Sequence, residues 1–583
     1  MRWATHLGLF TLAVLLPVHA GAQGNGTFAE AKSAGPIERT ETKPFNPHAT
    51  HPPEQSAKPW FDLTGLPSPS HATGLGDHHY GITAEREEAR AFFNQGLIYA
   101  YGFNHLEALR AFREAQTLDP DCAMCFWGEA YVLGPNLNLP MEAAAAPLAR
   151  AAAERAVGKA TKASAKEQAL AAAMLVRYAE PGERAELDRT YAEAMEGVAR
   201  SFPDDPDIAA LAAESLMLLS PWDYWLDSGR TPKEHTAKAL GLLEGALATV
   251  PNHIAAIHYY IHLVEASDRP QRAEPYADRL RGAAPDAGHL LHMPAHIYLR
   301  LGRYKDVLEV NKDAAASDER YLAANPGVQG PYPAMYYPHN IHFEMTAALM
   351  AGQGEPALRS EDKLARLIPD EAALAIPAAQ PIKQAPYFIH AQFSDPQTIL
   401  ALPSPSEKLP FVAASWRYAR GIAFSLMGKS EEADQEAGAI RDILSGDLSP
   451  LEQANVPARG ILEIAEKVVR AKAAAARGDF PGARQFAEAA VSLQDKLPYM
   501  EPPYWYIPVN QTLGAILLKS GSAREAAGAF REACAKAPNS AWALYGLMQA
   551  ETAAGNDQAA ARARERFEKA RAGGAQEPSL DRM

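Results

Sequence analysis

A 34-residue periodicity constrains this 583-residue chain more than any other feature of its sequence. Residues 89–122 and 507–540 share Gly at position 8 of the repeat, Ala at 20, Phe at 24, Ala at 27 and Pro at 32. Small side chains at positions 8 and 20 let two helices cross closely, and a proline at position 32 ends the second helix. The pattern therefore predicts paired antiparallel helices at both ends of the chain.

This register is typical of the tetratricopeptide repeat (TPR). The chain has almost no alternating β-branched runs, so we expect no sheet of three or more strands between residues 84 and 572. The predicted fold is all-α: a TPR helix-hairpin solenoid that winds as a right-handed superhelix, with Pro- and aromatic-rich loop insertions. Weaker copies of the repeat cover 254–287, 288–321, 338–371, 414–447 and 464–497, and a further unit, 206–253, is interrupted by SPWDYWLDSGRTP.

The first 22 residues have the pattern of a secretory signal peptide: a positive Arg2, an apolar run from Leu7 to Val18, and small residues at 20–22. The apolar run is shorter than the ~20 residues that cross a bilayer. No later apolar run reaches that length. The sequence therefore predicts export to the periplasm or the medium, with no membrane span after cleavage.

The remaining chain divides by composition and repeat register. We expect Pro- and aromatic-rich insertions at 322–337, 372–413 and 498–506. Long ordered loops often shape a site, although simple decoration of the repeat edge is the alternative. The predicted segments are a signal peptide (1–22), an extended Pro-rich leader (23–83), N-terminal helical hairpins (84–253), central His-rich repeats (254–371), an insertion (372–413), C-terminal repeats (414–572) and a loose tail (573–583).

Composition and motifs exclude several classes of function. The formal charge of −14, without a basic block, disfavours nucleic acid as a partner. No nucleotide-binding loop motif is present, so we expect no nucleotide. Cys122 and Cys125 form CAMC, but c-type haem attachment needs His where Phe126 stands. A local disulfide is the favoured interpretation of this pair, and metal ligation is the alternative.

Eight of the 18 histidines fall between His253 and His342. The repeat register places seven of them, all but His253, at equivalent positions of successive first helices. Positions 2, 5, 9 and 12 lie on one stripe by i, i+3, i+4 spacing, and we expect that stripe to line the concave groove. Position 2 holds His289 and His339, position 5 holds His258, His292 and His342, position 9 holds His262 and His296, and position 12 holds Glu265.

The stripe predicts a transition-metal site. His258 and His262, or His292 and His296, have the i, i+4 spacing with which a helix chelates a metal. Neighbouring helices lie ~8–10 Å apart, so their ligands can meet. Imidazole donors suit Zn, Cu, Fe or Ni. The predicted ligands are His258, His262, Glu265, His289, His292, His296, His339 and His342, and Glu214, at position 9 of the interrupted unit, is a further groove candidate.

Two other interpretations of the stripe remain open. The groove could instead hold a peptide, a protein or a small polar ligand, or the cluster could be structural coincidence. A metal with an open coordination position would make the protein an enzyme, with Glu265 or an unligated His as general base. A closed site would make it a binding module. The sequence does not decide between them.

Seven stretches between residues 76 and 342 resemble an exported bacterial TPR family that is largely uncharacterised, with HYYIHxVE and HMPAHIY motifs. The resemblance implies the fold and the positions of motifs, and no reaction. It adds His79, His105, Trp127 and Asn136 as groove candidates, because repeat packing does not require them. The stretches are GDHHYGIT (76–83), YGFNHLEALRAFREAQTLDPDCAMCFWGEA (101–130), GPNLNLPM (134–141), LSPWDYW (219–225), HYYIHLVEAS (258–267), HLLHMPAHIYLRLGRY (289–304) and HNIH (339–342).

Overall fold

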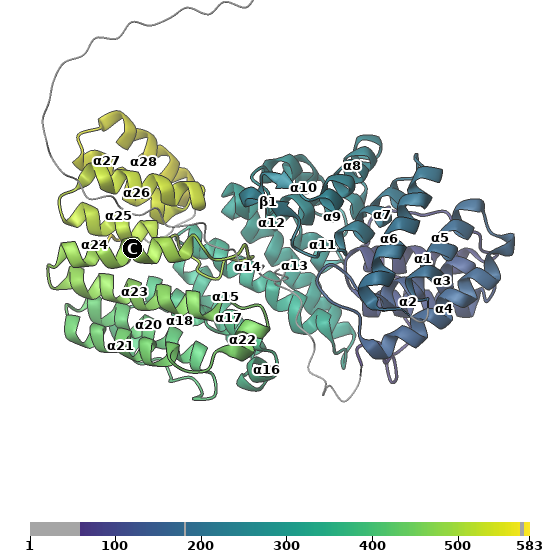
Figure 1. Cartoon of the computed structure of the whole chain (residues 1–583), viewed down its shortest axis with the longest axis horizontal. Coiled ribbons are helices and arrows are strands. Elements are labelled where there is room, and N and C mark those ends of the chain that lie inside the picture. The colour runs from purple at the N-terminus through teal and green to yellow at the C-terminus, as the bar shows by residue number, and fades with distance from the viewer. Residues whose placement is uncertain (1–58, 180–181, 572–576) are drawn as a thin grey trace, which may run out of the picture. The chain divides into compact units, whose positions relative to one another are not determined.

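The computed structural model describes residues 59–179, 182–571 and 577–583 (Figure 1). The expected signal peptide and leader residues 23–58 lie outside these ranges. The described chain is all-α, and helices that follow one another pair as hairpins. No helix in the described ranges is both long enough and apolar enough to cross a membrane.

Up to residue 367, the described chain contains fifteen α-helices and one small hairpin of two strands. β1 (Trp225–Leu226) and β2 (Thr231–Pro232) pair antiparallel inside the interrupted unit, and they form the only sheet of the described residues. The helices are α1 (Glu87–Tyr101), α2 (His105–Leu118), α3 (Ala123–Leu133), α4 (Ala146–Lys159), α5 (Ala165–Arg177), α6 (Arg184–Ser201), α7 (Pro206–Met217), α8 (Glu234–Thr249), α9 (Ile254–Val264), α10 (Glu274–Leu280), α11 (Gly288–His292), α12 (Pro294–Leu301), α13 (Tyr304–Ala324), α14 (Tyr337–Met350) and α15 (Gly354–Leu367).

The C-terminal half continues the series as α16 (Asp370–Ala375), α17 (Gln380–Lys383), α18 (Ala385–Phe393), α19 (Pro396–Leu400), α20 (Pro410–Leu426), α21 (Ser430–Leu444), α22 (Ser449–Gln453), α23 (Ala458–Ala476), α24 (Phe480–Gln494), α25 (Asn510–Lys519), α26 (Ala523–Lys536), α27 (Ala541–Ala553) and α28 (Asp557–Arg571). Short tight-helical segments are η1 (Ala143–Ala145), η2 (Ala160–Lys162), η3 (Asp227–Gly229), η4 (Pro270–Ala273) and η6 (Pro377–Ala379), and η5 (Tyr332–Tyr336) is π-helical.

The repeat pattern is explained by one phenylalanine in each strong repeat. Phe112 of α2 is fully buried between α1 and α3. A Cβ on Gly96 would lie 2.8 Å from its ring, and one on Gly128 would lie 2.5 Å away. Phe530 of α26 stands in the same relation to Gly514 and Gly546. Each glycine removes a methyl group where the aromatic ring must fit, so the predicted repeat fold is confirmed.

The insertions differ in structure. Residues 372–413 form several short helices, including α17, α18 and α19, where a loop was expected. Helices of four to nine residues are too short to show a clear apolar period, which is why the sequence pattern does not indicate them. Residues 322–337 end in the π-helical turn η5, which continues into α14. Residues 498–506 contain no helix.

Both ends of the described chain are tied to the repeats. In the leader, the Thr83 amide and hydroxyl donate to Glu167 at 2.6 and 2.7 Å, and Gly74 accepts from the Asp286 amide at 2.7 Å. The described tail, 577–583, is packed and not loose: Met583 is 3% exposed, and Lys472 donates to the Asp581 carbonyl at 2.9 Å.

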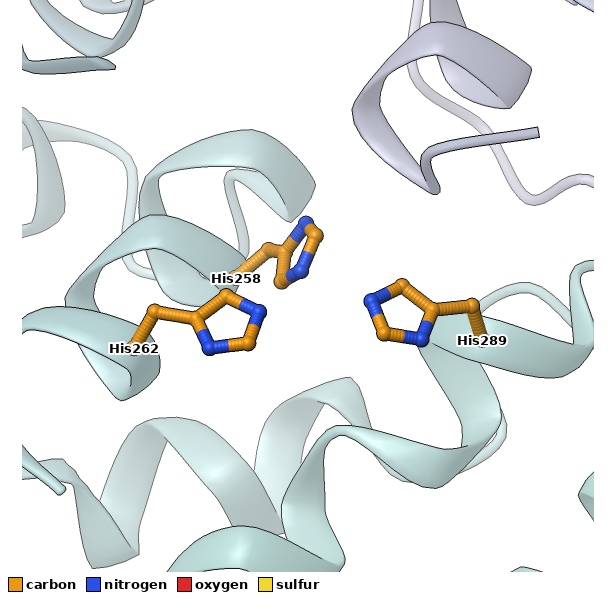
Figure 2. A group of neighbouring side chains, drawn as sticks. All are labelled: His258, His262 and His289. Atoms are coloured by element: carbon orange, nitrogen blue, oxygen red, sulfur yellow. The ribbon is translucent and has the colours of Figure 1, made fainter. Parts of the chain in front are cut away.

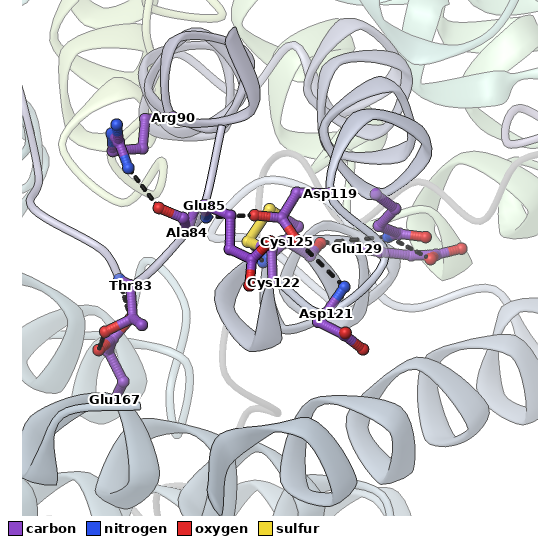
Figure 3. Close-up of a disulfide and its surroundings, with 11 residues drawn as sticks. Thr83, Ala84, Glu85, Arg90, Asp119, Asp121, Cys122, Cys125, Glu129 and Glu167 are labelled. Carbon is purple, nitrogen blue, oxygen red and sulfur yellow. Dashed lines mark hydrogen bonds between the residues drawn. A yellow bond between two sulfur atoms is a disulfide. The ribbon is translucent and has the colours of Figure 1, made fainter. Parts of the chain in front are cut away.

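Cys122 and Cys125 form a disulfide at the start of α3, as Figure 3 shows. Both cysteines are buried, and the Cys125 amide donates to the Cys122 sulfur at 3.2 Å, so Cys122 caps the helix. The disulfide interpretation of CAMC is confirmed. The bond occupies both thiols and removes them as metal ligands.

Candidate metal centre

Three histidine side chains from two helices meet in the interior. His258 and His262 project from α9, and His289 projects from α11 toward them (Figure 2). The ring centroid of His258 lies 4.8 Å from that of His262 and 5.0 Å from that of His289. One nitrogen of each ring lies within 4.8 Å of the other two. We call these residues the first trio.

Hydrogen bonds and burial leave the first trio with nitrogen lone pairs. The Nδ1–H of His258 donates to the Tyr101 carbonyl at 2.5 Å, so its Nε2 carries the lone pair. That Nε2 and both ring nitrogens of His289 are buried without a hydrogen-bond partner. Burial lowers the pKa of His258 to about 3 and holds the pKa of His289 well below its usual range. Both rings are therefore neutral at pH 7, which is the form that binds metal.

A second trio lies beside the first. It consists of His292 from α11, His296 from α12 and His339 from α14. The His292 ring centroid is 4.6 Å from that of His296 and 4.8 Å from that of His339. The trios adjoin, since the ring centroids of His262 and His296 are 5.4 Å apart.

Asn311 fixes the orientation of His292. Its Oδ1 accepts from Nδ1–H of His292 at 2.6 Å, and its Nδ2 donates to the Val307 carbonyl at 2.8 Å, which sets the direction of the amide. The Nε2 of His292 therefore faces the Nε2 of His296, at 2.8 Å. Two lone pairs would repel at this distance, so a proton or a metal ion has to lie between these rings.

The chain bends between these two histidines. α11 ends at His292 and α12 begins at Pro294, which has no backbone N–H to continue the helical hydrogen bonds. Met293 keeps helical backbone angles, φ −51° and ψ −38°, so the break is local. The i, i+4 pair remains on one side of the bend and its two Nε2 atoms converge.

Glu265 connects the two trios. Its Oε1 accepts from Nδ1 of His262 at 3.0 Å, and its Oε2 accepts from Nδ1 of His296 at 2.6 Å. A carboxylate on the far nitrogen of a ligating imidazole fixes the tautomer and makes the other nitrogen a better donor. The sequence proposed Glu265 as a ligand or a base, and in the structure it orients one histidine of each trio.

The insertion 498–506 brings a second carboxylate to this point. Glu501 bonds through Oε2 to Nδ1 of His296, and its Oε1 is buried without a partner. Burial would lower the pKa of His296, but the charges of Glu265 and Glu501 outweigh it and raise that pKa to about 10. Burial and repulsion from Glu501 hold the pKa of Glu265 well above its usual range.

Sequence reasoning missed Glu501. It lies outside every repeat, so no register places it. The available signal was its position as the only acidic residue in the aromatic insertion PYMEPPYWY.

A cavity of about 10 Å³ lies between the trios, and its walls include His262 and His289 of the first and His296 and His339 of the second. The rest of the wall is Asn138, Met335 and Tyr336. A void of this size holds about one water-sized sphere. The arrangement can therefore surround a small ion with nitrogen donors from both trios.

The histidine stripe does not face an open groove as expected. The five histidines that α9, α11 and α12 contribute to the stripe are at most 2% exposed. Phe103 covers the first trio, with its ring centroid 4.6 Å from His258 and 5.4 Å from His289, and Tyr336 lies 4.7 Å from His289. Phe103 comes from a turn between helices, and Tyr336 comes from the π-helical segment η5. Plain repeats lack such a π-helical segment.

A larger chamber of about 460 Å³ adjoins the small cavity, and Met335 and His339 line both. The leader and all three insertions contribute to its wall, for example through Trp60, Ala378 and Tyr506. The long insertions therefore shape a cavity next to the histidines, as one of the two sequence interpretations expected.

His342 belongs to the chamber and to neither trio. Its Nε2 hydrogen-bonds the Tyr506 hydroxyl at 2.6 Å, and burial lowers its pKa to about 3. His339 lies three residues earlier on α14, and it is the histidine of this helix that belongs to the second trio.

The other sequence candidates also lie outside the trios. Burial raises the pKa of Glu214 on α7 to about 7. Trp127 stacks on Tyr131 with ring centroids 5.2 Å apart. Asn136 accepts from two backbone amides, at 2.9 Å each, and so shapes its own loop. His105 is half-buried and desolvation lowers its pKa to about 4, and His79 is exposed.

A further group contains His78, Asp207 and His253. Asp207 Oδ1 accepts from Nε2 of His78 at 2.9 Å and from the Tyr101 hydroxyl at 2.7 Å. Nδ1 of His253 accepts from the Ala256 amide at 3.2 Å, so its proton is on Nε2, which faces Asp207 at 3.3 Å. The hydrogen bonds of His78 and of Nδ1 of His253, and the contact of Nε2 of His253 with Asp207, hold this group together. No sequence pattern indicated Asp207.

No family model matches the chain, and no curated protein matches it. Among solved structures, it is similar to human IFIT1 in a dimer with PPP-AAAA, at 13% identity and a TM-score of 0.30, over 84% of this chain and 92% of that one. Yeast Tom70 gives 12% identity and a TM-score of 0.26, over 81% and 90%. Naa15/Naa10 bound to HypK-THB gives 15% identity and a TM-score of 0.20, over 83% and 70%. Values this low carry no argument about function, and the fold rests on the helices of the chain itself.

Proposed function

We propose that this repeat protein binds a transition metal ion at the first trio, His258, His262 and His289. The observation that carries the proposal is the state of the donor atoms: Nε2 of His258 and both nitrogens of His289 are buried without a hydrogen-bond partner. A buried polar atom left unpaired costs about 1–3 kcal/mol. Coordination to a metal would satisfy Nε2 of His258 and the one nitrogen of the neutral His289 ring that carries a lone pair.

The surroundings support the same proposal. His258 and His262 each use Nδ1 to bond a carbonyl or a carboxylate, which is the usual arrangement behind a metal-bound imidazole. The donor set is nitrogen, which suits Zn, Cu, Ni or Fe, whereas Mg and Ca prefer oxygen. The second trio, joined through Glu265, provides a place for a second ion.

The proposed centre is of the open kind. Three protein ligands leave at least one position of each ion for water or a ligand, as in catalytic zinc sites. The buried carboxylates Glu265 and Glu501 lie beside that position and can hold or release a proton. These features favour a metalloenzyme over a closed structural site. A peptide held against the histidine stripe would need an exposed stripe, and these side chains are buried.

We also propose that the protein is exported, to the periplasm or the medium. The signal-peptide pattern in residues 1–22 supports this. The disulfide between Cys122 and Cys125 supports it independently, because such bonds persist mainly in oxidising compartments.

The metal proposal is tested by elemental analysis of the purified full chain after loading with Zn, Cu, Ni or Fe(II). We expect stoichiometric metal in the wild type and loss of at least one equivalent in His258→Ala and in His289→Ala. His79→Ala is the matched control, since His79 is exposed. Circular dichroism confirms that each variant is folded. A wild type that binds none of the four metals, or a folded His289→Ala that keeps full occupancy, refutes the proposal.

A further inference from the structure

The 460 Å³ chamber beside the trios has a lining with a definite chemical character. Most of its wall is apolar or aromatic, with Trp60, Ile382, Met500 and Tyr504 among the contributors. Cavities of about 300–1,000 Å³ with such walls hold small organic molecules. The chamber is therefore of a size for one organic ligand with an apolar body.

Among the described residues of the wall, the acidic side chains have no basic counterpart. Its described residues include Asp62, Glu142 and Glu501, and no Lys or Arg is among them. A low-dielectric cavity strengthens the attraction of opposite charges and the repulsion of like charges. The wall therefore favours a cationic ligand and disfavours a carboxylate or a phosphate.

One acceptor in the wall lacks a donor. Glu501 lines the chamber and is 3% exposed, its Oε2 bonds His296, and its Oε1 has no hydrogen-bond partner. Buried carboxylate oxygens are rarely left unpaired, because the cost of desolvation is high. Oε1 is itself covered, so an N–H group of a ligand in the chamber would reach it after a rotation of the Glu501 side chain.

The chamber leads to the metal position. Met335 and His339 line both the chamber and the small cavity between the trios. A ligand head group at Glu501 would therefore lie next to the ions, while the body remained among the apolar residues of the insertions.

We propose that the chamber binds an organic amine, with an apolar or aromatic body in the chamber and its N–H group at Glu501. This inference names the substrate class of the metal centre. It rests on the proposed function only in placing the amine head group next to bound metal ions. The recognition itself depends on the chamber wall, which is present with or without metal.

The first experiment measures binding of three probes with the same body to the metal-free full chain by calorimetry: 4-phenylbutylamine, 4-phenylbutan-1-ol and 4-phenylbutyrate. We expect the amine to bind most tightly and the carboxylate at least about tenfold more weakly than the amine. An equal affinity for all three, or a preference for the carboxylate, overturns the proposal.

The second experiment locates the site. Ala378→Trp places a large side chain in the chamber, whereas Ala375→Trp, on the same insertion, alters an exposed residue outside the wall. We expect Ala378→Trp to weaken amine binding more than about tenfold and Ala375→Trp to leave it unchanged. Equal amine binding by both folded variants overturns the assignment.

A charge variant serves if Ala378→Trp does not fold. Glu142→Gln keeps the shape of the wall and removes one charge, and Glu142 contributes to neither trio. We expect amine affinity to fall about threefold to tenfold at low salt, with alcohol binding unchanged. An equal effect on both probes overturns the charge argument.

Metal content, measured on the same preparations, separates the two proposals. Full metal occupancy without preferential amine binding overturns only the amine inference. Amine binding without any metal uptake overturns only the proposed metal function.

Discussion

Glu265→Gln tests how the two trios are oriented. In the structure one carboxylate oxygen accepts from His262 and the other from His296. A glutamine has one oxygen and one NH₂ group, so in either orientation its NH₂ faces an imidazole N–H. One histidine then loses its acceptor and can turn or change tautomer, which removes its Nε2 lone pair from the metal.

The expected effect falls on metal affinity more than on the fold. In the metal-free protein, burial and repulsion from Glu501 hold the pKa of Glu265 well above its usual range, which favours the protonated acid. Glutamine resembles that protonated acid, so the variant should fold. A bound divalent cation draws the proton off Glu265, and glutamine cannot supply the resulting carboxylate. Loss of such a supporting carboxylate typically weakens metal binding ~10–100-fold, or about 1.4–2.7 kcal/mol.

The assay is a zinc titration in competition with a chromophoric chelator, at pH 7. Asp268→Asn is the matched control, because Asp268 is an exposed acid three residues away and loses the same charge. We expect both ions to bind more weakly in Glu265→Gln, since Glu265 supports one histidine of each trio. A zinc affinity within about twofold of the wild type would refute the reasoning.

Four further predictions follow from individual residues. His296 has a pKa of about 10, so zinc binding at the second trio should release a proton at pH 7 and tighten as the pH rises. His258 has a pKa of about 3, so zinc binding at the first trio should depend little on pH above pH 5. A titration with a pH indicator measures the proton release. Burial opposes ionisation of Asp207, but bonds from His253 and His78 lower its pKa. A carboxyl with a lowered pKa stabilises the fold above its unfolded pKa, so Asp207→Asn should lower the free energy of unfolding by about 1–3 kcal/mol at pH 7, and this difference should shrink as urea melts are repeated below about pH 4. Phe112→Ala should lower the free energy of unfolding by about 3–5 kcal/mol in urea melts, because the ring is fully buried between two glycines. Cys122→Ser should keep its metal on elemental analysis, because the disulfide belongs to neither trio.

The repeat register predicted the convergence of the histidines because equal positions on successive helices lie side by side. This reasoning expected His258, His262, His292, His296 and His342 to converge. The structure brings the first four together with His289 and His339, and His342 lies apart. It also predicted the Phe and Gly positions of the strong repeats, since Phe112 contacts glycines on the two neighbouring helices. These features depend on local periodicity, which a single sequence contains.

The features that the sequence did not predict come from segments without a register. Glu501 lies in an insertion, and Phe103 lies in a turn with a left-handed backbone, at φ 56°. Both close over the histidines, so the site is a buried cavity where an open groove was expected. His342 has the same repeat position as His258, but the Tyr506 hydroxyl, also from the insertion, holds its ring in the chamber.

The bond between His296 and Glu501 has a consequence for the order of folding. The two residues are 205 positions apart. Repeat proteins gain most of their stability from neighbouring units, so the central helices can form while the later ones are still being made. The second carboxylate, however, reaches the histidines only after some two hundred more residues have been synthesised and packed. An N-terminal fragment that ends before residue 498 would therefore contain all six histidines of the trios in an incomplete site. The complete site, with both carboxylates, therefore forms only in a chain that has folded as far as the insertion 498–506.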